Sequence, residues 1–400
     1  MSHRTVDVNL PGREYQVRVG AGALIGLGKE TRAIVDDKAS RVFLVVDTGV
    51  LGRFVDSLCK ELESQGFAVK IAKVTPSEKI KSIETYHRLL LDIAATGHTR
   101  IDPVIALGGG VVGDLAGFVA ASYQRGVPVI QCPTTLLAMV DASVGGKTGF
   151  NLVVPNNSAK STIYKNQVYK NLVGAFHQPS LVVADMAVLD SLDARYRRAG
   201  LAECVKHGMI CQTIANGHEG LLDWMIEQLD DIRAFDQSTI EELVARNVAL
   251  KATVVMGDEH ESTGAKAGGR MLLNFGHTFG HAIETIDGLS PDVSNPGLSP
   301  LHHGEAVALG MVAACHCSVA AGLCEESVVH ELENILETIG LPTRVAGLPD
   351  TDEILDRMMR DKKTAGGSLR VILPIGRGEC AIVDSPDRAA VSTGIDSIRG

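Results

Sequence analysis

The pattern of apolar and polar positions changes its period near the middle of the chain. In the first half, short apolar runs rich in β-branched residues alternate with turns and with segments of helical period. Such runs are typical of strands buried on both faces of a parallel sheet, and their alternation with helices indicates an α/β domain. The predicted strands span residues 42–46, 68–72, 104–107 and 127–130, with a helix over 83–93. We therefore predict an α/β domain over residues 1–185.

The second half has longer segments in which apolar residues recur at helical spacing. A stripe of this kind is typical of helices that bury one face. The expected helices span residues 191–213, 219–229, 239–255, 277–286, 303–321 and 325–339. Residues 369–374 and 379–383 have the alternation of a short hairpin. We predict a helical second domain over residues 186–385, followed by a flexible tail over 386–400.

Length and composition narrow the possible function classes. A chain of 400 residues is long enough for two domains with a cleft between them. The net charge of -10 argues against a nucleic-acid partner, although a local basic pocket for a small anion is compatible with it. The eight cysteines form no Cys-x-x-Cys pair, and neither a long apolar run nor an apolar N-terminal segment occurs. We expect a cytoplasmic protein with no membrane partner.

A glycine-rich turn follows the third predicted strand. Residues 108–114 read Gly-Gly-Gly-Val-Val-Gly-Asp and lead into a helical segment, a pattern that lets backbone N–H groups approach a pyrophosphate. An ordinary Rossmann unit has an acidic residue about 20 positions later, but residues 121–130 contain none. Asp47, which ends the first predicted strand, is the candidate for the ribose hydroxyls. A tight turn without a ligand is the alternative.

Two polar clusters in the helical half predict a metal site. His277 and His281 are four residues apart and share one helix face, and His303 opens the next helical segment. Glu203 and Lys206 lie three apart on an otherwise apolar helix, where a buried carboxylate needs a partner. Glu203, His277 and His303 would form a set of two histidines and one carboxylate, as in catalytic zinc sites. A surface ion pair and core histidines are the alternatives.

Six motifs occur in order along the chain. They read Gly-Gly-Gly-Val-Val-Gly-Asp, Pro-Thr-Thr-Leu-Leu-Ala, Asp-Ala-Ser-Val-Gly-Gly-Lys, Ala-Glu-Cys-Val-Lys, Asn-Phe-Gly-His-Thr-Phe-Gly-His-Ala and His-Gly-Glu-Ala-Val. Over residues 40–375 this set resembles the 3-dehydroquinate synthase family of sugar-phosphate cyclases. The resemblance implies a Rossmann-like NAD-binding α/β domain, an all-α metal-binding domain and a homodimer. The implied cofactors are NAD and one divalent metal, zinc or cobalt.

The resemblance also implies a reaction. The family converts 3-deoxy-D-arabino-heptulosonate 7-phosphate, a small anionic sugar phosphate, to 3-dehydroquinate and phosphate in the shikimate pathway of aromatic amino acid biosynthesis. Transient oxidation by NAD would be followed by phosphate elimination, re-reduction and aldol cyclisation. The rivals are cyclases that make 2-epi-5-epi-valiolone or 2-deoxy-scyllo-inosose, and a metal-dependent polyol dehydrogenase. Asn274 and His281 favour the dehydroquinate branch over the valiolone branch.

The resemblance assigns roles residue by residue. The metal ligands would be Glu203, His277 and His303. The NAD contacts would be Asp47, Glu78, Lys81, Gly109, Gly110, Asp114, Thr134 and Thr135. The catalytic residues would be Lys147, Lys206, Lys251, Arg270, Asn274 and His281, with His281 relaying a proton. The substrate-binding residues would be Arg125, Asp141, Lys170, Asn171 and Lys362.

Two insertions separate this sequence from the family pattern. Residues 152–169 replace a shorter loop, so that Lys165 is a rival for the position given to Lys170. Lys363, the next residue in the sequence, is likewise a rival for the position given to Lys362. A smaller Gly/Ala-rich insertion precedes Arg270 and lengthens the loop that carries it. The insertions therefore bear on substrate choice.

Overall fold

The structure is a computed structural model of two compact units, Met1–Leu192 and Asp193–Gly400. It describes residues 3–155, 166–214, 217–262, 266–292, 294–363 and 369–400, and only the backbone at residues 155, 166–168, 266–268, 296 and 360–363. The predicted domain boundary, after residue 185, precedes the 3₁₀ segment Met186–Ser191, which stays with the first unit. Within the described residues, no helix is long and apolar enough to cross a membrane.

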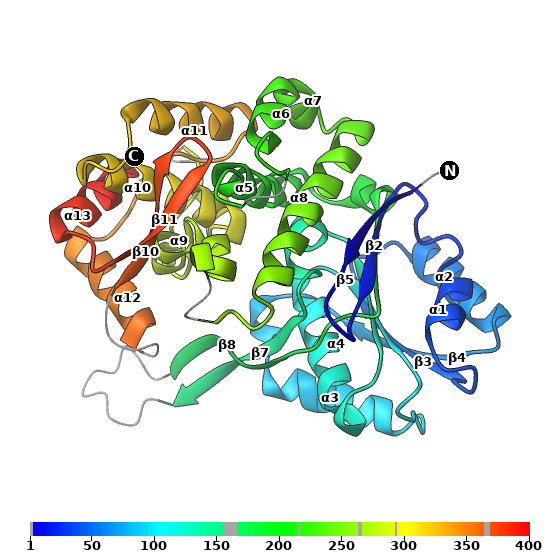
Figure 1. Ribbon diagram of the computed structural model, residues 1–400. Coiled ribbons are helices and arrows are strands. Elements are labelled where there is room, and N and C mark those ends of the chain that lie inside the picture. Colours follow the sequence, from blue (N-terminus) through cyan, green and yellow to red (C-terminus); the bar gives the residue numbers. More distant parts are fainter. Residues whose placement is uncertain (1–2, 156–165, 215–216, 263–265, 293, 364–368) are drawn as a thin grey trace. The chain divides into compact units, whose positions relative to one another are not determined.

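The first unit is built on a seven-stranded sheet (Figure 1). Its strands are β1 (Arg4–Val8), β2 (Tyr15–Gly20), β3 (Arg41–Asp47), β4 (Ala68–Val74), β5 (Val104–Gly108), β6 (Val129–Pro133) and β9 (Leu181–Asp185). Their order is β1-β2-β9-β6-β5-β3-β4, and only the β1–β2 pair is antiparallel. The four strands predicted from apolar runs are confirmed as β3, β4, β5 and β6. β1, β2 and β9 were not predicted.

The strand order changes direction between β3 and β5. From β3 the chain crosses to β4 on one side, and then returns to β5 on the other side of β3. In an open parallel sheet, ligands bind at such a switch point, beyond the carboxyl ends of the strands. Asp47 ends β3 and Gly108 ends β5. The topology therefore brings the predicted ribose partner and the glycine turn to one place.

Helices and a hairpin complete the first unit. They are α1 (Leu27–Ile34), α2 (Gly52–Ser64), α3 (Ile83–Ala94), α4 (Gly110–Ser122), β7 (Lys147–Pro155) and β8 (Asn166–Phe176), with short helical segments at Glu78–Ile80, Tyr123–Arg125 and Ala138–Ala142. Apolar side chains of β3 and β5 form one core with α3 and α4, which includes Phe43, Val104, Leu89 and Leu115. The β7–β8 hairpin packs against α4 and contributes Phe150 to this core. The predicted helix over 83–93 is confirmed as α3.

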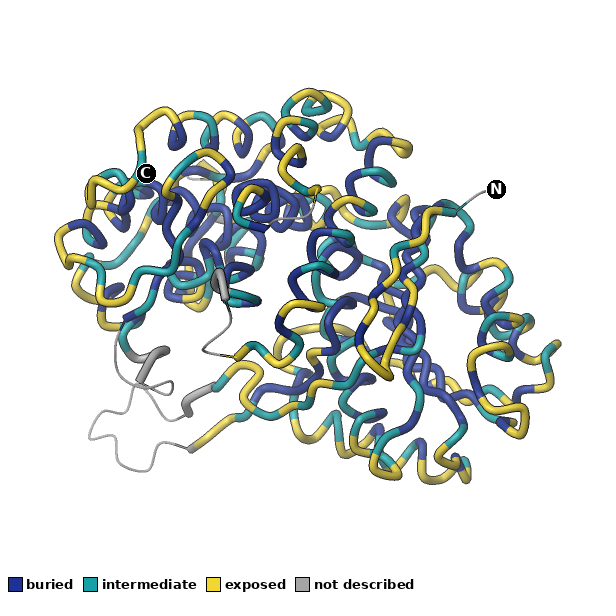
Figure 2. Tube along the Cα trace, in the orientation of Figure 1, coloured by how far each residue is buried: buried dark blue, intermediate teal, exposed yellow. Residues whose placement is uncertain are grey.

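The second unit is mainly helical. Its elements are α5 (Ala194–Ile210), α6 (Leu221–Glu227), α7 (Leu229–Ala234), α8 (Gln237–Gly257), α9 (His277–Glu284), α10 (His303–Ala320), α11 (Glu326–Thr338), α12 (Thr351–Lys363), β10 (Arg370–Gly376), β11 (Glu379–Asp384) and α13 (Arg388–Ser397), with 3₁₀ segments Lys266–Asn274 and Pro296–Leu298. The predicted helices correspond to α5, α6, α8, α9, α10 and α11, and the predicted hairpin to β10–β11. α10 packs against α5, α9, α11, α13 and β10, and Figure 2 shows it largely buried.

The expected flexible tail is wrong, because most of it is helix α13. Asp387 caps the helix by accepting a hydrogen bond from the backbone N–H of Ala390. Val391 and Ile395 are buried, and the helix packs on α10. Serine, threonine and glycine inside this short segment give it a weak intrinsic preference for helix. Burial against α10 supplies the stability that the local sequence lacks.

Two glycines let α10 approach its neighbours closely. A methyl group on Gly304 would overlap the carbonyl oxygen of Ala199 in α5, and one on Gly310 would overlap the carbonyl oxygen of Gly276, which precedes α9. Neither glycine needs an unusual backbone angle, so the constraint is space alone. These close approaches hold the start of α10 against α5 and the start of α9 against the middle of α10. The three helices carry the predicted metal ligands.

We predict that Gly310→Ala destabilises the protein. The added methyl group overpacks the α9–α10 contact, which should lower the free energy of unfolding by about 1–3 kcal/mol in denaturant titrations. Gly257→Ala is the matched control, because this glycine also lies in a helix but has no atom within 4 Å of the added methyl group. The control should change stability by no more than about 0.5 kcal/mol. Equal effects at the two positions would contradict the packing argument.

Candidate functional site

The predicted metal ligands converge in the second unit. Glu203 on α5 is fully buried, and its Oε1 lies 3.7 Å from Nε2 of His277 and 3.4 Å from Nε2 of His303. One ligand atom from each residue lies within 4.8 Å of the others. The Oε2 atom of Glu203 forms an ion pair with Lys206, one turn further along α5. Two imidazoles and a carboxylate at this spacing fit a divalent metal such as zinc.

His277 presents a neutral nitrogen to Glu203. Its Nδ1 lies 3.1 Å from the backbone carbonyl oxygen of Phe275, which can accept the Nδ1 proton and leave the lone pair on Nε2. Burial lowers the pKa of His277 to about 3, against the attraction of Glu203 and with a smaller contribution from Lys206. A metal ligand must be an unprotonated imidazole, so the surroundings of His277 suit that role.

His303 is fixed at the start of α10 by a capped helix end. The side chain of Glu305 accepts a hydrogen bond from the backbone N–H of His302 at 2.7 Å. Arg195 on α5 donates to both oxygens of Glu305, at 2.7 and 2.8 Å. Burial by itself lowers the pKa of His303, but Glu203 and Glu284 outweigh this effect and raise the pKa to about 10. Without a metal, His303 is therefore protonated at neutral pH.

The other predicted residues of the second unit lie on nearby elements. His281 is exposed on α9, and its ring centre lies 5.3 Å from that of His277. Arg270 is buried and donates from Nη1 to the backbone oxygen of Glu259 at 2.7 Å. Asn274 donates to Oε1 of Glu261 at 3.3 Å.

The remaining predicted residues of this unit are Lys251 and Lys362, with Lys363 as the rival of Lys362. Lys251 is buried on α8, which packs against the 3₁₀ segment that carries Arg270. The side chains of Lys362 and Lys363 lie outside the described residues. Glu261 and Glu284 were not predicted as site residues, although Glu284 shares a helix face with His277 and His281 and could have been found from that spacing.

A polar network in the first unit joins four predicted residues. Lys81 donates to Oδ2 of Asp114 and to Oδ1 of Asn171, both at 2.5 Å. Asn151 donates to Oε2 of Glu78 at 2.7 Å and accepts from the backbone N–H of Asn171 at 3.0 Å. The hairpin thus places Asn171 beside Asn151, and the assignment of Lys170 stays a prediction. Lys165, the rival, lies outside the described residues. Asn151 itself was not predicted as a site residue.

The remaining NAD candidates gather at the carboxyl ends of β3, β5 and β6. Burial raises the pKa of Asp47, against hydrogen bonds from the backbone N–H groups of Gly49 and Gly109. Thr134 donates its backbone N–H to the oxygen of Gly108, and the side chain of Thr135 lies against Gly109. Gly110 begins α4, so the helix N-terminus faces this edge of the sheet. An acidic side chain and a helix N-terminus at a switch point suit a dinucleotide.

The other substrate candidates of the first unit occupy its loops and hairpin. Arg125 is exposed in the turn after α4, and Asp141 is half-buried in the segment Ala138–Ala142. Lys147 is exposed at the start of β7, and Lys170 is exposed on β8. These positions leave their side chains accessible to a ligand.

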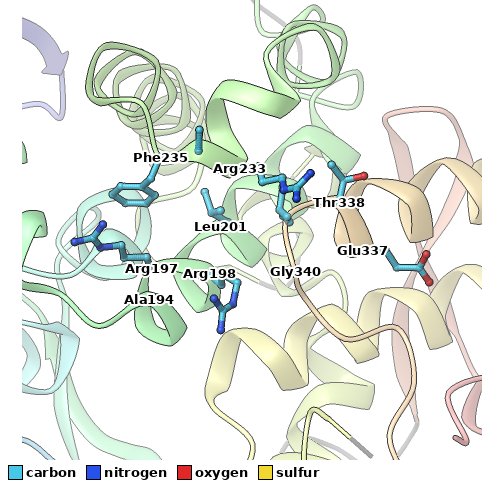
Figure 3. A pocket seen from close by; sticks show the side chains of 11 residues that line it. Ala194, Arg197, Arg198, Leu201, Arg233, Phe235, Glu337, Thr338 and Gly340 are labelled. Atoms are coloured by element: carbon cyan, nitrogen blue, oxygen red, sulfur yellow. The ribbon is translucent and has the colours of Figure 1, made fainter.

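A hollow of about 620 Å³ occurs elsewhere in the second unit (Figure 3). The start of α5, the end of α7 and the end of α11 line it, with Arg197, Arg198, Arg233 and Phe235 among the lining side chains. Arg197 lies over the ring of Phe235, with its guanidinium carbon 4.9 Å from the ring centre. None of the predicted site residues whose side chains are described lines this hollow, so it is not the candidate site.

Comparison with known proteins agrees with the geometry. Residues 71–199 match the model of the 3-dehydroquinate synthase N-terminal domain, and residues 200–364 match that of the C-terminal domain. The 3-dehydroquinate synthase of Caulobacter vibrioides (strain NA1000 / CB15N) is 38% identical over 392 residues, which cover 97% of each chain. The chain belongs to the 3-dehydroquinate synthase family. It is an enzyme of the lyase class.

Solved structures show the same fold. A 2-deoxy-scyllo-inosose synthase complexed with carbaglucose-6-phosphate, NAD+ and Co2+ is 24% identical, with a TM-score of 0.78 over 98% of this chain and 99% of that one. A 2-epi-5-epi-valiolone synthase from Streptomyces hygroscopicus subsp. jinggangensis 5008, with NAD+ and Zn2+ bound, is 24% identical, with a TM-score of 0.77 over 96% of each chain. The predicted fold class, a Rossmann-like α/β domain followed by a helical second domain, is confirmed.

Metal binding at this site should release about one proton per metal ion near neutral pH. His303 must lose its proton to bind, whereas His277 is already neutral. The dissociation constant for Zn2+ should therefore fall about tenfold for each pH unit between roughly pH 6.5 and 8.5. Competition with a chelator of known pH dependence measures this slope. An affinity that does not change with pH would contradict the raised pKa of His303.

Proposed function

We propose that the protein is a 3-dehydroquinate synthase that converts 3-deoxy-D-arabino-heptulosonate 7-phosphate to 3-dehydroquinate and phosphate. The convergence of Glu203, His277 and His303, in a chain that matches the family along almost its whole length, is the observation that carries this proposal. A site with two histidines and one carboxylate leaves coordination positions for a substrate oxygen. The reaction belongs to the shikimate pathway of aromatic amino acid biosynthesis.

The proposed cofactors are NAD and one divalent metal ion, zinc or cobalt. Asp47 and the glycine turn at the switch point of the sheet support NAD, and the residues Glu203, His277 and His303 would hold the metal. When bound, NAD supplies a reversible hydride acceptor and the metal supplies a Lewis acid that polarises the reacting alcohol or ketone. Glu78, Lys81, Asp114, Thr134 and Thr135 complete the proposed NAD contacts.

The side chains of the second unit have distinct proposed tasks. Lys206 holds the buried carboxylate of Glu203 by an ion pair. Arg270 and Lys251 are buried cations that balance the negative charge of the substrate. Asn274, held by Glu261, contacts a substrate hydroxyl. His281 is exposed beside His277 and relays a proton to and from solvent.

The first unit supplies the remaining proposed substrate contacts. They are Arg125, Asp141, Lys147, Lys170 and Asn171. Their arginine and lysine side chains suit phosphate and carboxylate groups, which a chain of net charge -10 binds only where cations are gathered locally. Lys362 keeps its predicted role on the resemblance alone. A homodimer and a cytoplasmic location also stay predictions from the sequence.

An activity assay tests the assignment. Purified protein should release phosphate from the heptulosonate phosphate and form dehydroquinate in amounts that exceed the added NAD, because the cofactor is regenerated in each turnover. Phosphate release and dehydroquinate are measured together, with zinc present. Turnover of a sedoheptulose or hexose phosphate without reaction of this substrate would assign the protein to another cyclase. Stoichiometric formation of NADH would instead indicate a dehydrogenase.

Replacing a metal ligand should remove metal and activity together. We expect His277→Ala to lose stoichiometric zinc and to lower kcat/KM by more than about 100-fold. Loss of a residue that only supports a metal ligand costs up to about 100-fold, and loss of a ligand itself should cost more. His316→Ala is the control, since this histidine pairs with Glu333. It lies thirteen residues after His303 on α10, about 20 Å along the helix. Metal content by mass spectrometry and steady-state kinetics are the readouts. Full zinc content in His277→Ala would contradict the proposed ligand set.

A further inference from the structure

The imidazole of His303 lies between two carboxylates. Its Nε2 is 3.4 Å from Oε1 of Glu203, and its Nδ1 is 3.5 Å from Oε1 of Glu284. Glu203 belongs to the proposed metal site, but Glu284 has no role in the family pattern described above. A histidine that binds a metal through one nitrogen commonly donates its other N–H to a carboxylate or a carbonyl oxygen. Glu284 occupies the place of that acceptor.

We propose that Glu284 is a positioning residue for the metal site. Its carboxylate accepts the Nδ1 proton of His303, which fixes the tautomer and the ring orientation that present the Nε2 lone pair beside Glu203. The inference rests on the proposed function only in requiring that Glu203, His277 and His303 hold a metal ion. It adds a residue that acts on the metal through His303.

The place of Glu284 on α9 makes this role specific. It is the last residue of the helix that begins with His277, two helical turns earlier, so both side chains project from one face. One short helix thereby supplies one ligand and orients the second. The two histidines also follow the same rule, because the Nδ1 of His277 faces the backbone oxygen of Phe275 at 3.1 Å. A backbone carbonyl serves His277, and a side-chain carboxylate serves His303.

His303 needs such a partner more than His277 does. Its side chain is 33% exposed, compared with 12% for His277, so water can reach the ring. When His303 gives up a proton to bind a metal, either ring nitrogen can lose it, and only loss from Nε2 leaves that lone pair for the metal. The side chain of Glu284 is only 12% exposed and keeps its carboxylate close to Nδ1. Its removal should therefore weaken metal binding without removing a ligand.

The same geometry would also allow Glu284 to bind a metal ion directly. His281, Glu284 and His303 also bring one ligand atom each within 4.8 Å of the others. A metal ion in that group would use Nδ1 of His303, whereas the proposed site uses Nε2. The first group contains the fully buried carboxylate of Glu203, and the second contains the exposed His281. Burial favours the first group, and metal stoichiometry distinguishes the two roles.

The test compares metal affinity in three variants. Glu284→Ala should bind Co2+ and Zn2+ about 10- to 100-fold more weakly than the parent protein in chelator competition. Glu284→Gln should lose less, because its amide oxygen can still accept the Nδ1 proton. Glu333→Gln is the matched control, since Glu333 on α11 lies 3.4 Å from Nε2 of His316, a histidine of the same helix α10 as His303. The metal affinity of this variant should equal that of the parent protein.

Each outcome of the experiment has one meaning. Dissociation constants for Glu284→Ala within twofold of the parent value would overturn the inference. So would a parent protein that binds two ions, of which Glu284→Ala loses one, because Glu284 would then be a ligand. NAD binding and the denaturant midpoint, measured alongside, show whether the variant is folded. A parent protein that binds no metal would contradict the proposed function itself, which separates the two failures.

Discussion

The helical unit depends on a carboxylate that has no contact with water. Glu203 is fully buried on α5, and an isolated charge in that environment costs several kcal/mol or more unless partners surround it. Lys206, His277 and His303 are those partners, and they come from three helices. Glycines on α10 make room for this arrangement by letting the helices approach to backbone contact. The fold and the site therefore share one constraint, because the packing that closes the core also brings the ligands together.

The first unit reaches its candidate site by a different physical route. There the backbone sets the place of the site, since a parallel sheet aligns the carboxyl ends of its strands and the strand order changes direction between β3 and β5, where ligands bind in open parallel sheets. Only then do side chains add specificity, through Asp47 at the end of β3 and through the network of Lys81, Asp114 and Asn171. Through Lys81, that network ties β8 of the β7–β8 hairpin to α4.

The candidate site contains buried cations although the chain as a whole is negatively charged. The chain carries a net charge of -10, yet Lys206, Lys251 and Arg270 are all buried in the helical unit. Buried cations are rare because their desolvation is costly, so their presence indicates fixed negative partners, a bound anion or both. Arg270 is held by two residues that precede the insertion. Its Nη1 donates to the backbone oxygen of Glu259, and its backbone N–H donates to the carboxylate of Asp258. These contacts orient a residue that is proposed to contact substrate.

The sequence by itself determined the features that depend on local pattern. Apolar runs predicted β3, β4, β5 and β6, and helical spacing predicted α3 and six helices of the second unit. Residue chemistry predicted the set of Glu203, His277 and His303. Only the tertiary structure decided which structure the segments with a weak local pattern adopt. Burial on α10 makes a helix of residues 388–397, and sheet pairing makes strands of β1, β2 and β9. It also decided which distant side chains meet, such as Glu284 with His303 and Asn151 with Asn171. Periodicity depends on residues that are close together in the sequence, whereas these contacts form only when elements far apart in the chain pack together.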